Sequence, residues 1–270
     1  MRRLLAIVAM LTALCLLTTI AYAADGGATG ARRVPVLLYH RIVQGEARAP
    51  LEVSAGAFAS QMDWLKRLGF HFATTDEVEG FAAGRIRLPR RSVLVTFDDG
   101  YEDNYTMAFP ILKEYGARAT IFIITSLVGK PGYLTPAQIT EMTASGLVDF
   151  QLHTDALHYQ TPDGQSAVLA VPPAKLVADL STARVKLTTW TGKRPHVFAY
   201  PFGFYNDRVA EPLKTVGVTS AYTVEPGYVR PGDPMFKLHR IPIFGTTRHR
   251  YLQRLIGLRF LGAIEGFAFR

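Results

Sequence analysis

Apolar runs of strand length alternate along the chain with segments whose apolar residues recur at helical spacing. Residues 34–39 and 119–124 are almost continuously apolar, as in strands that are covered on both faces. Between residues 54 and 68 the large apolar residues instead recur every three or four positions, and Gly69 follows as a helix stop. The same pattern predicts strands at 34–39, 70–74, 92–97, 119–124, 148–152, 196–200, 218–223 and 238–243, and helices at 54–68, 76–83, 108–115, 135–146, 176–189 and 207–216.

This alternation predicts a mainly parallel sheet with helices outside it, either as an open doubly wound sheet or as a barrel. One domain is expected for 270 residues, although two small domains would also fit. Polar residues follow several of the predicted strands, namely His40, Asp98, Asp99, His153 and the segment 201–203. Because ligands bind at the carboxyl ends of parallel strands, we expect these residues to meet at one rim.

The first 23 residues have the pattern of a secretory signal peptide. Two arginines precede an apolar stretch from residue 4 to residue 20, and Ala21 and Ala23 supply small residues at a cleavage point. We therefore expect an exported protein, in the periplasm or at the cell surface, with a flexible leader at 24–33 and a globular domain at 34–250. An uncleaved membrane anchor is the alternative, because the apolar stretch approaches the roughly 20 residues that span a bilayer.

Cysteine content and charge exclude some functions. The only cysteine, Cys15, lies within the signal segment, so the mature chain has neither a disulfide nor a catalytic thiolate. The formal net charge of +8 falls to +6 without Arg2 and Arg3, and there is no dense Lys/Arg run, so we expect no nucleic-acid partner. The mild positive charge would suit an anionic cell envelope, and it equally fits a solvated surface without a partner.

Two pairs of residues have the composition of a metal site. Asp98 and Asp99 stand side by side at a strand end, and His153 and His158 lie just after another strand. Two imidazoles and one carboxylate are a common ligand set for a catalytic divalent metal, and a cation would offset the repulsion between the adjacent acids. Taken singly, the acids could be turn residues and the histidines unconnected surface residues. Together, at strand ends of one α/β pattern, they favour a site.

Three stretches resemble the polysaccharide deacetylases of carbohydrate esterase family 4. They are Thr96-Phe97-Asp98-Asp99-Gly100, then His153-Thr154 with His158, then Tyr200-Pro201-Phe202-Gly203. The resemblance covers residues 34 to about 245. It implies an α/β fold, namely a deformed (β/α) barrel of about seven parallel strands in a single domain. It also implies metal-dependent removal of N-acetyl groups from an amino-sugar polymer.

The resemblance also assigns roles to residues. Asp98 would be the general base, and Asp99, His153 and His158 would hold one divalent transition metal ion. Zinc is the first expectation, with nickel, cobalt or iron as alternatives. The tetrahedral oxyanion would be held by the cation and by a backbone N–H, for which we predict Phe202. Tyr200 and Pro201 complete this oxyanion and substrate-binding segment.

Departures from the common family pattern refine these expectations. The five-residue histidine spacing and the strand end Tyr39-His40 look like the branch that deacetylates poly-β-1,6-N-acetylglucosamine. Many members carry an arginine that orients the base two residues before the proline, and here that position is Ala199. The general acid usually comes from a late Leu-x-His stretch, whereas His239 directly follows a leucine, so its side chain should face away. We therefore predict His40 as the acid, with His239 as the doubtful alternative.

Residues 251–270 and the substrate leave alternatives open. The C-terminal stretch mixes arginines with large apolar residues, which predicts a final helix on the barrel or a peripheral segment on a membrane or envelope partner. The polymer could instead be β-1,4-linked, as in peptidoglycan or chitin. A non-catalytic sugar-binding protein on the same scaffold is a third possibility. Among the rim aromatics, Tyr133 and Phe204 are candidate sugar contacts.

Overall fold

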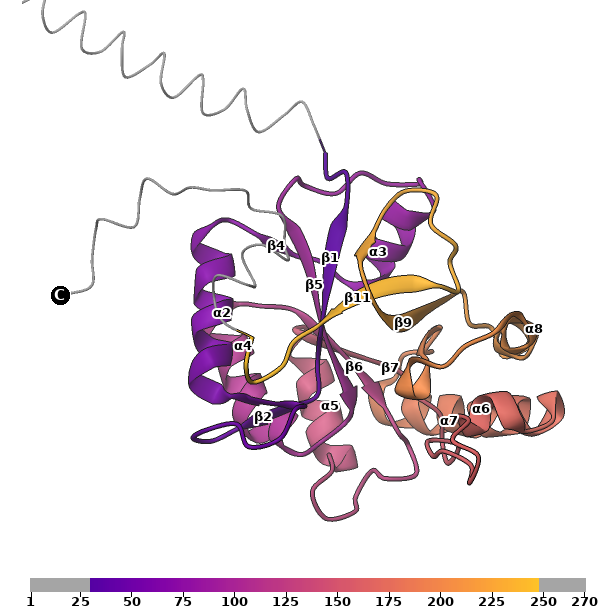
Figure 1. The fold of residues 1–270 in the computed structure, drawn as a ribbon. Helices are drawn as coiled ribbons and strands as arrows, with labels where there is room; N and C mark the ends of the chain where they lie inside the picture. Colours follow the sequence, from indigo (N-terminus) through magenta and orange to yellow (C-terminus); the bar gives the residue numbers. More distant parts are fainter. Residues whose placement is uncertain (1–29, 248–270) are drawn as a thin grey trace, which may run out of the picture.

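Seven parallel strands form a closed barrel in the computed structural model, which describes residues 30–247 (Figure 1). Going around the barrel, β1 pairs with β11, then β9, β8, β7, β6 and β5 follow, and β5 pairs again with β1. The strands are β1 Val34–Tyr39, β5 Ser92–Asp99, β6 Ala119–Ile123, β7 Val148–Leu152, β8 Val197–Ala199, β9 Ser220–Pro226 and β11 Leu238–Pro242. This confirms the predicted seven-stranded barrel and decides against an open sheet.

The barrel is deformed at the seam between β1 and β5. The first residues of β5 pair with the short strand β4 (His71–Phe72), and only from Leu94 onward does β5 pair with β1. The start of β1 pairs instead with β10 (Tyr228–Val229) in antiparallel orientation. The two barrel strands therefore have different partners at their amino ends and meet only toward their carboxyl ends.

Helices surround the barrel, and a helix also lies near its amino-terminal end. The outer helices are α2 Ala55–Arg67, α4 Phe109–Tyr115, α5 Pro136–Ala144, α6 Ala167–Ala170, α7 Pro173–Thr191 and α8 Asp207–Thr215. Helix α3 (Thr75–Ala82) contributes Val78 and Phe81 to one apolar cluster with barrel residues such as Leu94 and Phe122. We call this end of the barrel, where the strands begin, the floor. The carboxyl ends of the strands form the opposite rim.

Local sequence explains several element boundaries. Thr135 and Gln138 form the predicted capping box at the start of α5. Thr74 forms a second capping box with Glu77 at the start of α3. The strand predicted at 70–74 therefore ends at Phe72, because Thr74 already caps the helix. Strand β8 begins at Val197, one residue later than predicted, and the Gln151 side chain accepts hydrogen bonds from the backbone N–H groups of residues 196 and 197 at this point.

Some elements were not predicted. The short parallel pair β2 (Arg41–Val43) and β3 (Glu52–Ser54) lies in a polar stretch without alternation, and a π-helical turn at Asn104–Ala108 precedes α4. Strand β10 and helix α6 are too short for a periodic signal. The predicted signal peptide at 1–23, most of the leader at 24–33 and the C-terminal helix at 251–270 lie outside the described residues. Between residues 30 and 247, no helix combines the length and the apolar character of a membrane span.

Candidate active site

Asp99, His153 and His158 meet at the rim of the barrel. The Oδ1 atom of Asp99 lies 3.4 Å from Nε2 of His153 and 3.3 Å from Nε2 of His158. The two Nε2 atoms are 3.1 Å apart. Three ligands at zinc–ligand distances in a tetrahedral arrangement would be separated by roughly 3.3–3.6 Å. The triangle therefore has the donor types and nearly the dimensions that a first-row divalent ion needs, and we call it the metal triangle.

Unusual backbone conformations hold the triangle together. Within residues 30–247, the three non-glycine residues with positive φ are Asp99 at 76°, Thr154 at 76° and Phe202 at 58°. One is a member of the triangle, one follows His153, and one packs its ring against His158 with centroids 4.6 Å apart. Such conformations are costly and collect at functional sites. Gly100, next to Asp99, has φ of 78°, and a Cβ there would lie 2.4 Å from Ile123.

Hydrogen bonding and burial orient the two histidines of the triangle. Nδ1 of His153 lies 2.8 Å from the carbonyl oxygen of Ala199, so a neutral ring donates there and keeps the Nε2 lone pair for the triangle. Burial alone would lower the pKa of His153, but the carboxylates of Asp98 and Asp99 raise it overall. Burial and the neighbouring His153 lower the pKa of His158 to about 4. The pKa of Asp99 is lowered: burial opposes this, but the hydrogen bond and charge of His153 prevail.

Asp98 forms a buried, bidentate ion pair with Arg240. Nη1 and Nη2 of Arg240 each donate to one carboxylate oxygen at 2.7 Å, and Nε donates to the carbonyl oxygen of Thr223 at 2.8 Å. Both side chains are almost completely inaccessible to solvent. Burial alone would raise the pKa of Asp98, but Arg240 and then His153 lower it overall. The carboxylate is thus ionised and fixed beside the metal triangle.

Arg240 is the site residue that the sequence analysis missed. It offsets the repulsion between Asp98 and Asp99, and it holds Asp98 although Ala199 replaces the expected arginine. The sequence does contain a signal for Arg240, because it lies within the predicted strand 238–243 on the same face as the apolar Leu238. That face points into the barrel, where Leu238 packs in the apolar cluster and the Arg240 guanidinium lies 5.5 Å from the centre of the Phe122 ring.

The two candidate acids lie in different places. His40 follows β1, and its electrostatic neighbours are Asp98, Asp99, Arg240 and His153, which places it at the same rim. Burial lowers its pKa below the usual value, although the two carboxylates act in the opposite direction. His239 precedes Arg240 on β11 and so points away from the barrel interior. On that outer side its Nδ1 lies 3.7 Å from Oε2 of Glu225.

The segment after β8 lies against the triangle. Phe202 is 42% exposed, and its positive φ is followed by Gly203 at 77°, where a Cβ would lie 2.2 Å from Val224. Tyr200 is buried, and its hydroxyl donates to the carbonyl of Phe236 at 3.1 Å, so its side chain supports the turn. Pro201 is buried at the start of the same turn.

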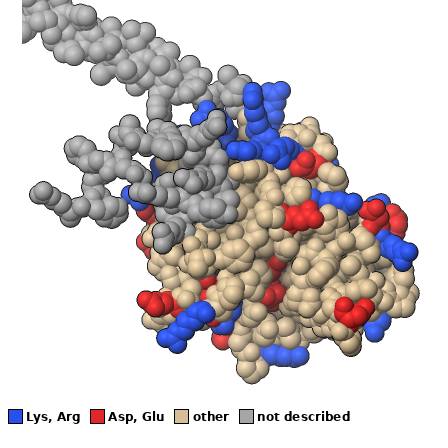
Figure 2. Space-filling model, in the orientation of Figure 1, with Lys and Arg blue, Asp and Glu red and all other residues tan. Residues whose placement is uncertain are grey.

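Aromatic side chains lie near the metal triangle and in a neighbouring surface cleft. Tyr101 and Tyr133 are stacked with centroids 5.3 Å apart, and Asp99 is an electrostatic neighbour of both. Phe204, also 42% exposed, lines an open cleft of about 470 Å³ that extends from Gly203 to Lys237. Figure 2 shows that acidic and basic side chains are scattered over the visible face, between large areas that carry neither charge.

Comparison with known proteins decides the family. The profile described as polysaccharide deacetylase matches residues 85–221, which include Asp98, Asp99 and both histidines of the triangle. The chain belongs to the polysaccharide deacetylase family. It is 31% identical over 210 residues to the poly-beta-1,6-N-acetyl-D-glucosamine N-deacetylase of Staphylococcus aureus strain MSSA476, covering 76% of this chain and 72% of that one.

Solved structures of deacetylases share the fold. IcaB from Ammonifex degensii is 33% identical with a TM-score of 0.75, over 84% of this chain and 97% of that one. The Streptococcus pyogenes deacetylase PplD, solved in complex with acetate, is 27% identical with the same TM-score, over 84% and 99% of the two chains. The recognition of this deacetylase family from its motifs is therefore confirmed.

Proposed function

We propose that this polysaccharide deacetylase is an exported, metal-dependent enzyme that removes N-acetyl groups from poly-β-1,6-N-acetylglucosamine. The observation that carries the proposal is the metal triangle with the ionised, Arg240-bound carboxylate of Asp98 beside it. The preference for the β-1,6 polymer is supported by the similarity to the Staphylococcus aureus enzyme and to IcaB. Export rests on the pattern of residues 1–23.

Asp99, His153 and His158 would hold the ion, through one carboxylate oxygen and two Nε2 atoms. When bound, a divalent ion at this position supplies a Lewis acid for the acetamide carbonyl and lowers the pKa of a water ligand. Donor chemistry alone does not separate zinc from nickel, cobalt or iron, and zinc is our first choice.

The surrounding residues would carry the proton transfers. Asp98 accepts the proton of the attacking water, because its carboxylate is ionised and held by two hydrogen bonds to Arg240. The backbone N–H of Phe202 donates to the developing oxyanion, and such a donor is worth about 3 kcal/mol in the transition state. His40 protonates the departing amine, since it lies at the same rim and His239 points elsewhere.

Aromatic faces on two sides would position the sugar. Tyr101 and Tyr133 form a stacked pair beside Asp99, and Phe202 lies against His158. Flat apolar rings suit the axial C–H face of a sugar. A sugar unit held between the tyrosine pair and Phe202 would direct its acetamide group to the metal triangle. The cleft from Gly203 to Lys237 would take neighbouring sugar units.

Acetate release from defined oligomers tests the proposal. We expect zinc-loaded protein to release acetate from β-1,6-linked N-acetylglucosamine oligomers faster than from β-1,4-linked chitin oligomers. Asp98→Asn should retain bound metal and lose activity by a factor of about 10²–10⁴. Faster release from chitin oligomers would reassign the linkage. Sugar binding with no acetate release from either polymer would instead indicate a non-catalytic protein.

A further inference from the structure

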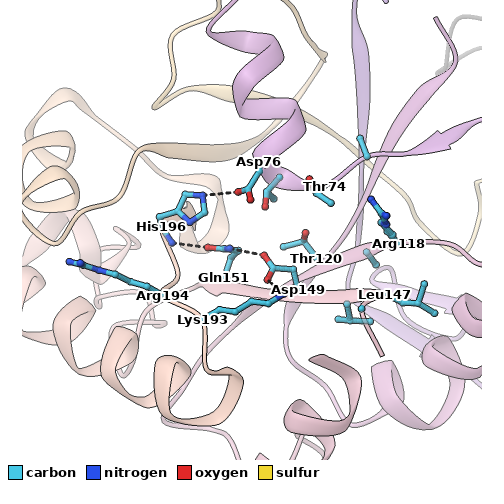
Figure 3. A pocket seen from close by; sticks show the side chains of 15 residues that line it. Thr74, Asp76, Arg118, Thr120, Leu147, Asp149, Gln151, Lys193, Arg194 and His196 are labelled. Carbon is cyan, nitrogen blue, oxygen red and sulfur yellow. Dashed lines mark hydrogen bonds and ion pairs between the residues drawn. The ribbon is translucent and has the colours of Figure 1, made fainter. Parts of the chain in front are cut away.

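A second group of metal-ligating side chains lies on the floor of the barrel, far along the strands from the metal triangle. Asp76 and Glu79 come from α3, and His196 directly precedes β8. Nε2 of His196 lies 2.9 Å from Oδ1 of Asp76 and 3.5 Å from Oε2 of Glu79. Figure 3 shows the imidazole of His196 pointing toward Asp76 at the edge of a pocket. We call these three residues the floor cluster.

The floor cluster has dimensions similar to those of the metal triangle. In both groups, one ligand atom from each residue lies within 4.8 Å of the other two. The two histidine–carboxylate distances on the floor, 2.9 and 3.5 Å, bracket the 3.1–3.4 Å separations of the triangle. One imidazole and two carboxylates are also a ligand set that zinc and its neighbours accept.

Supporting contacts orient two of the three ligands. The backbone of His196 is fixed on both sides, because its N–H donates to Oε1 of Gln151 at 2.9 Å and its carbonyl oxygen accepts from the N–H of Thr219 at 2.8 Å. Glu79 is buried, and burial restricts its carboxylate to the position facing the imidazole of His196. Asp76 is exposed and stands one helical turn before Glu79, so it can close on an ion from outside.

The adjoining pocket leaves room for the remaining coordination positions. It has a volume of about 290 Å³, and its lining includes Asp76, His196, Gln151 and Thr120 (Figure 3). A pocket of this volume can hold several water molecules beside these polar side chains. Open positions filled by water are what a cation with three protein ligands requires.

We propose that Asp76, Glu79 and His196 form a second binding site for a divalent first-row metal ion, separate from the catalytic site and structural in role. The ion would join α3 to the start of β8. Nothing in the deacetylation reaction depends on this ion.

Zinc stoichiometry of the whole protein tests the site. Wild type and variants are loaded with zinc, dialysed against a weak chelator, and analysed by mass spectrometry for zinc per chain. Wild type should hold two ions, His153→Ala one, His196→Asn one, and the double variant none. Glu79→Gln is a second variant that should also lose one ion, in case His196→Asn does not fold.

The matched control is His71→Ala. His71 forms an ion pair with Glu77 at 2.9 Å, and both side chains are about one-third exposed. Within residues 30–247 it has no second carboxylate partner, unlike His196. This variant should keep both ions. A thermal shift gives an independent measurement, since zinc at about 100 times its dissociation constant should raise the Tm of His153→Ala by roughly 5–10 °C, and Glu79→Gln should abolish that rise.

The outcomes separate this site from the catalytic one. One ion in wild type and none in His153→Ala would overturn the second site, leaving the floor cluster as an ion pair. Two ions in both wild type and His196→Asn would also overturn it. One ion that survives His153→Ala and is lost in Glu79→Gln would support the floor site and contradict the metal-dependent mechanism proposed for the triangle.

Discussion

Replacing Arg240 with methionine tests how the catalytic carboxylate is held. The substitution removes both 2.7 Å hydrogen bonds and leaves the buried Asp98 without its charge partner. Removing one partner of a buried pair typically costs about 3–5 kcal/mol, whereas an exposed pair is worth about 0–1 kcal/mol. Urea unfolding at pH 7 should therefore show a loss of about 3–5 kcal/mol for Arg240→Met. Arg67→Met, which breaks the exposed pair with Asp63, should lose at most about 1 kcal/mol.

The pH dependence follows from the sign of the pKa shift. In the folded protein the pKa of Asp98 lies below its usual value because Arg240 outweighs burial. The pair therefore stabilises the fold above the unfolded-state pKa of about 3.9, and this contribution is lost as the pH falls through the folded value. Without Arg240, burial loses the largest charge that opposes it, so the pKa of Asp98 rises. The acid limb of kcat/KM should then move to higher pH, with partial recovery of activity at alkaline pH.

Two results would refute this reasoning. One is an unchanged acid limb in Arg240→Met, which would mean that Asp98 is not the base or that Arg240 does not set its ionisation. The other is a stability loss no larger than that of Arg67→Met. The double variant Asp98→Asn with Arg240→Met serves as the control, because it should recover part of the stability that Arg240→Met alone loses.

Three further predictions concern the acid, the rim turn and the metal. His40→Ala should lower kcat by about 10²–10⁴-fold in acetate-release assays while His239→Ala stays near wild type, and the reverse order would transfer the acid role to His239. Gly203→Ala should lower the Tm clearly more than Gly232→Ala. A Cβ at Gly203 would lie 2.2 Å from Val224, whereas a Cβ at Gly232 would meet nothing within 4 Å. Equal shifts of the Tm would contradict this packing. At pH 6, zinc binding to the triangle should release about one proton, measured by calorimetry in buffers of different ionisation enthalpy. The reason is that burial lowers the pKa of His158 to about 4, whereas Asp98 and Asp99 raise the pKa of His153. Release of no proton would contradict these shifts.

The sequence predicted most barrel strands because they are apolar on both faces. Segments such as 119–124 leave little choice of element, and the glycine and capping signals at residues 69 and 135 fixed nearby helix ends. Barrel closure did not follow from periodicity, since β1 pairs with β5 and β11 through long-range contacts. The resemblance to a family supplied that part.

The site was predictable where neighbouring residues carried the signal. Asp98 and Asp99 are adjacent, and the two histidines of the triangle lie five residues apart. Arg240 was missed because it lies 142 positions from Asp98 and meets it only across the barrel interior. The alternation of β11 predicted that His239 faces away from the barrel and, applied one residue further, would have pointed Arg240 inward.

Anomalous diffraction from zinc-soaked crystals, recorded on both sides of the zinc absorption edge, tests the central claim most directly. The account predicts a peak about 2.0–2.2 Å from Oδ1 of Asp99 and from Nε2 of His153 and His158, with Asp98 still bound to Arg240 and outside the coordination sphere. Zinc-replete crystals with no peak at the triangle, or with zinc coordinated by Asp98 in place of Asp99, would contradict it.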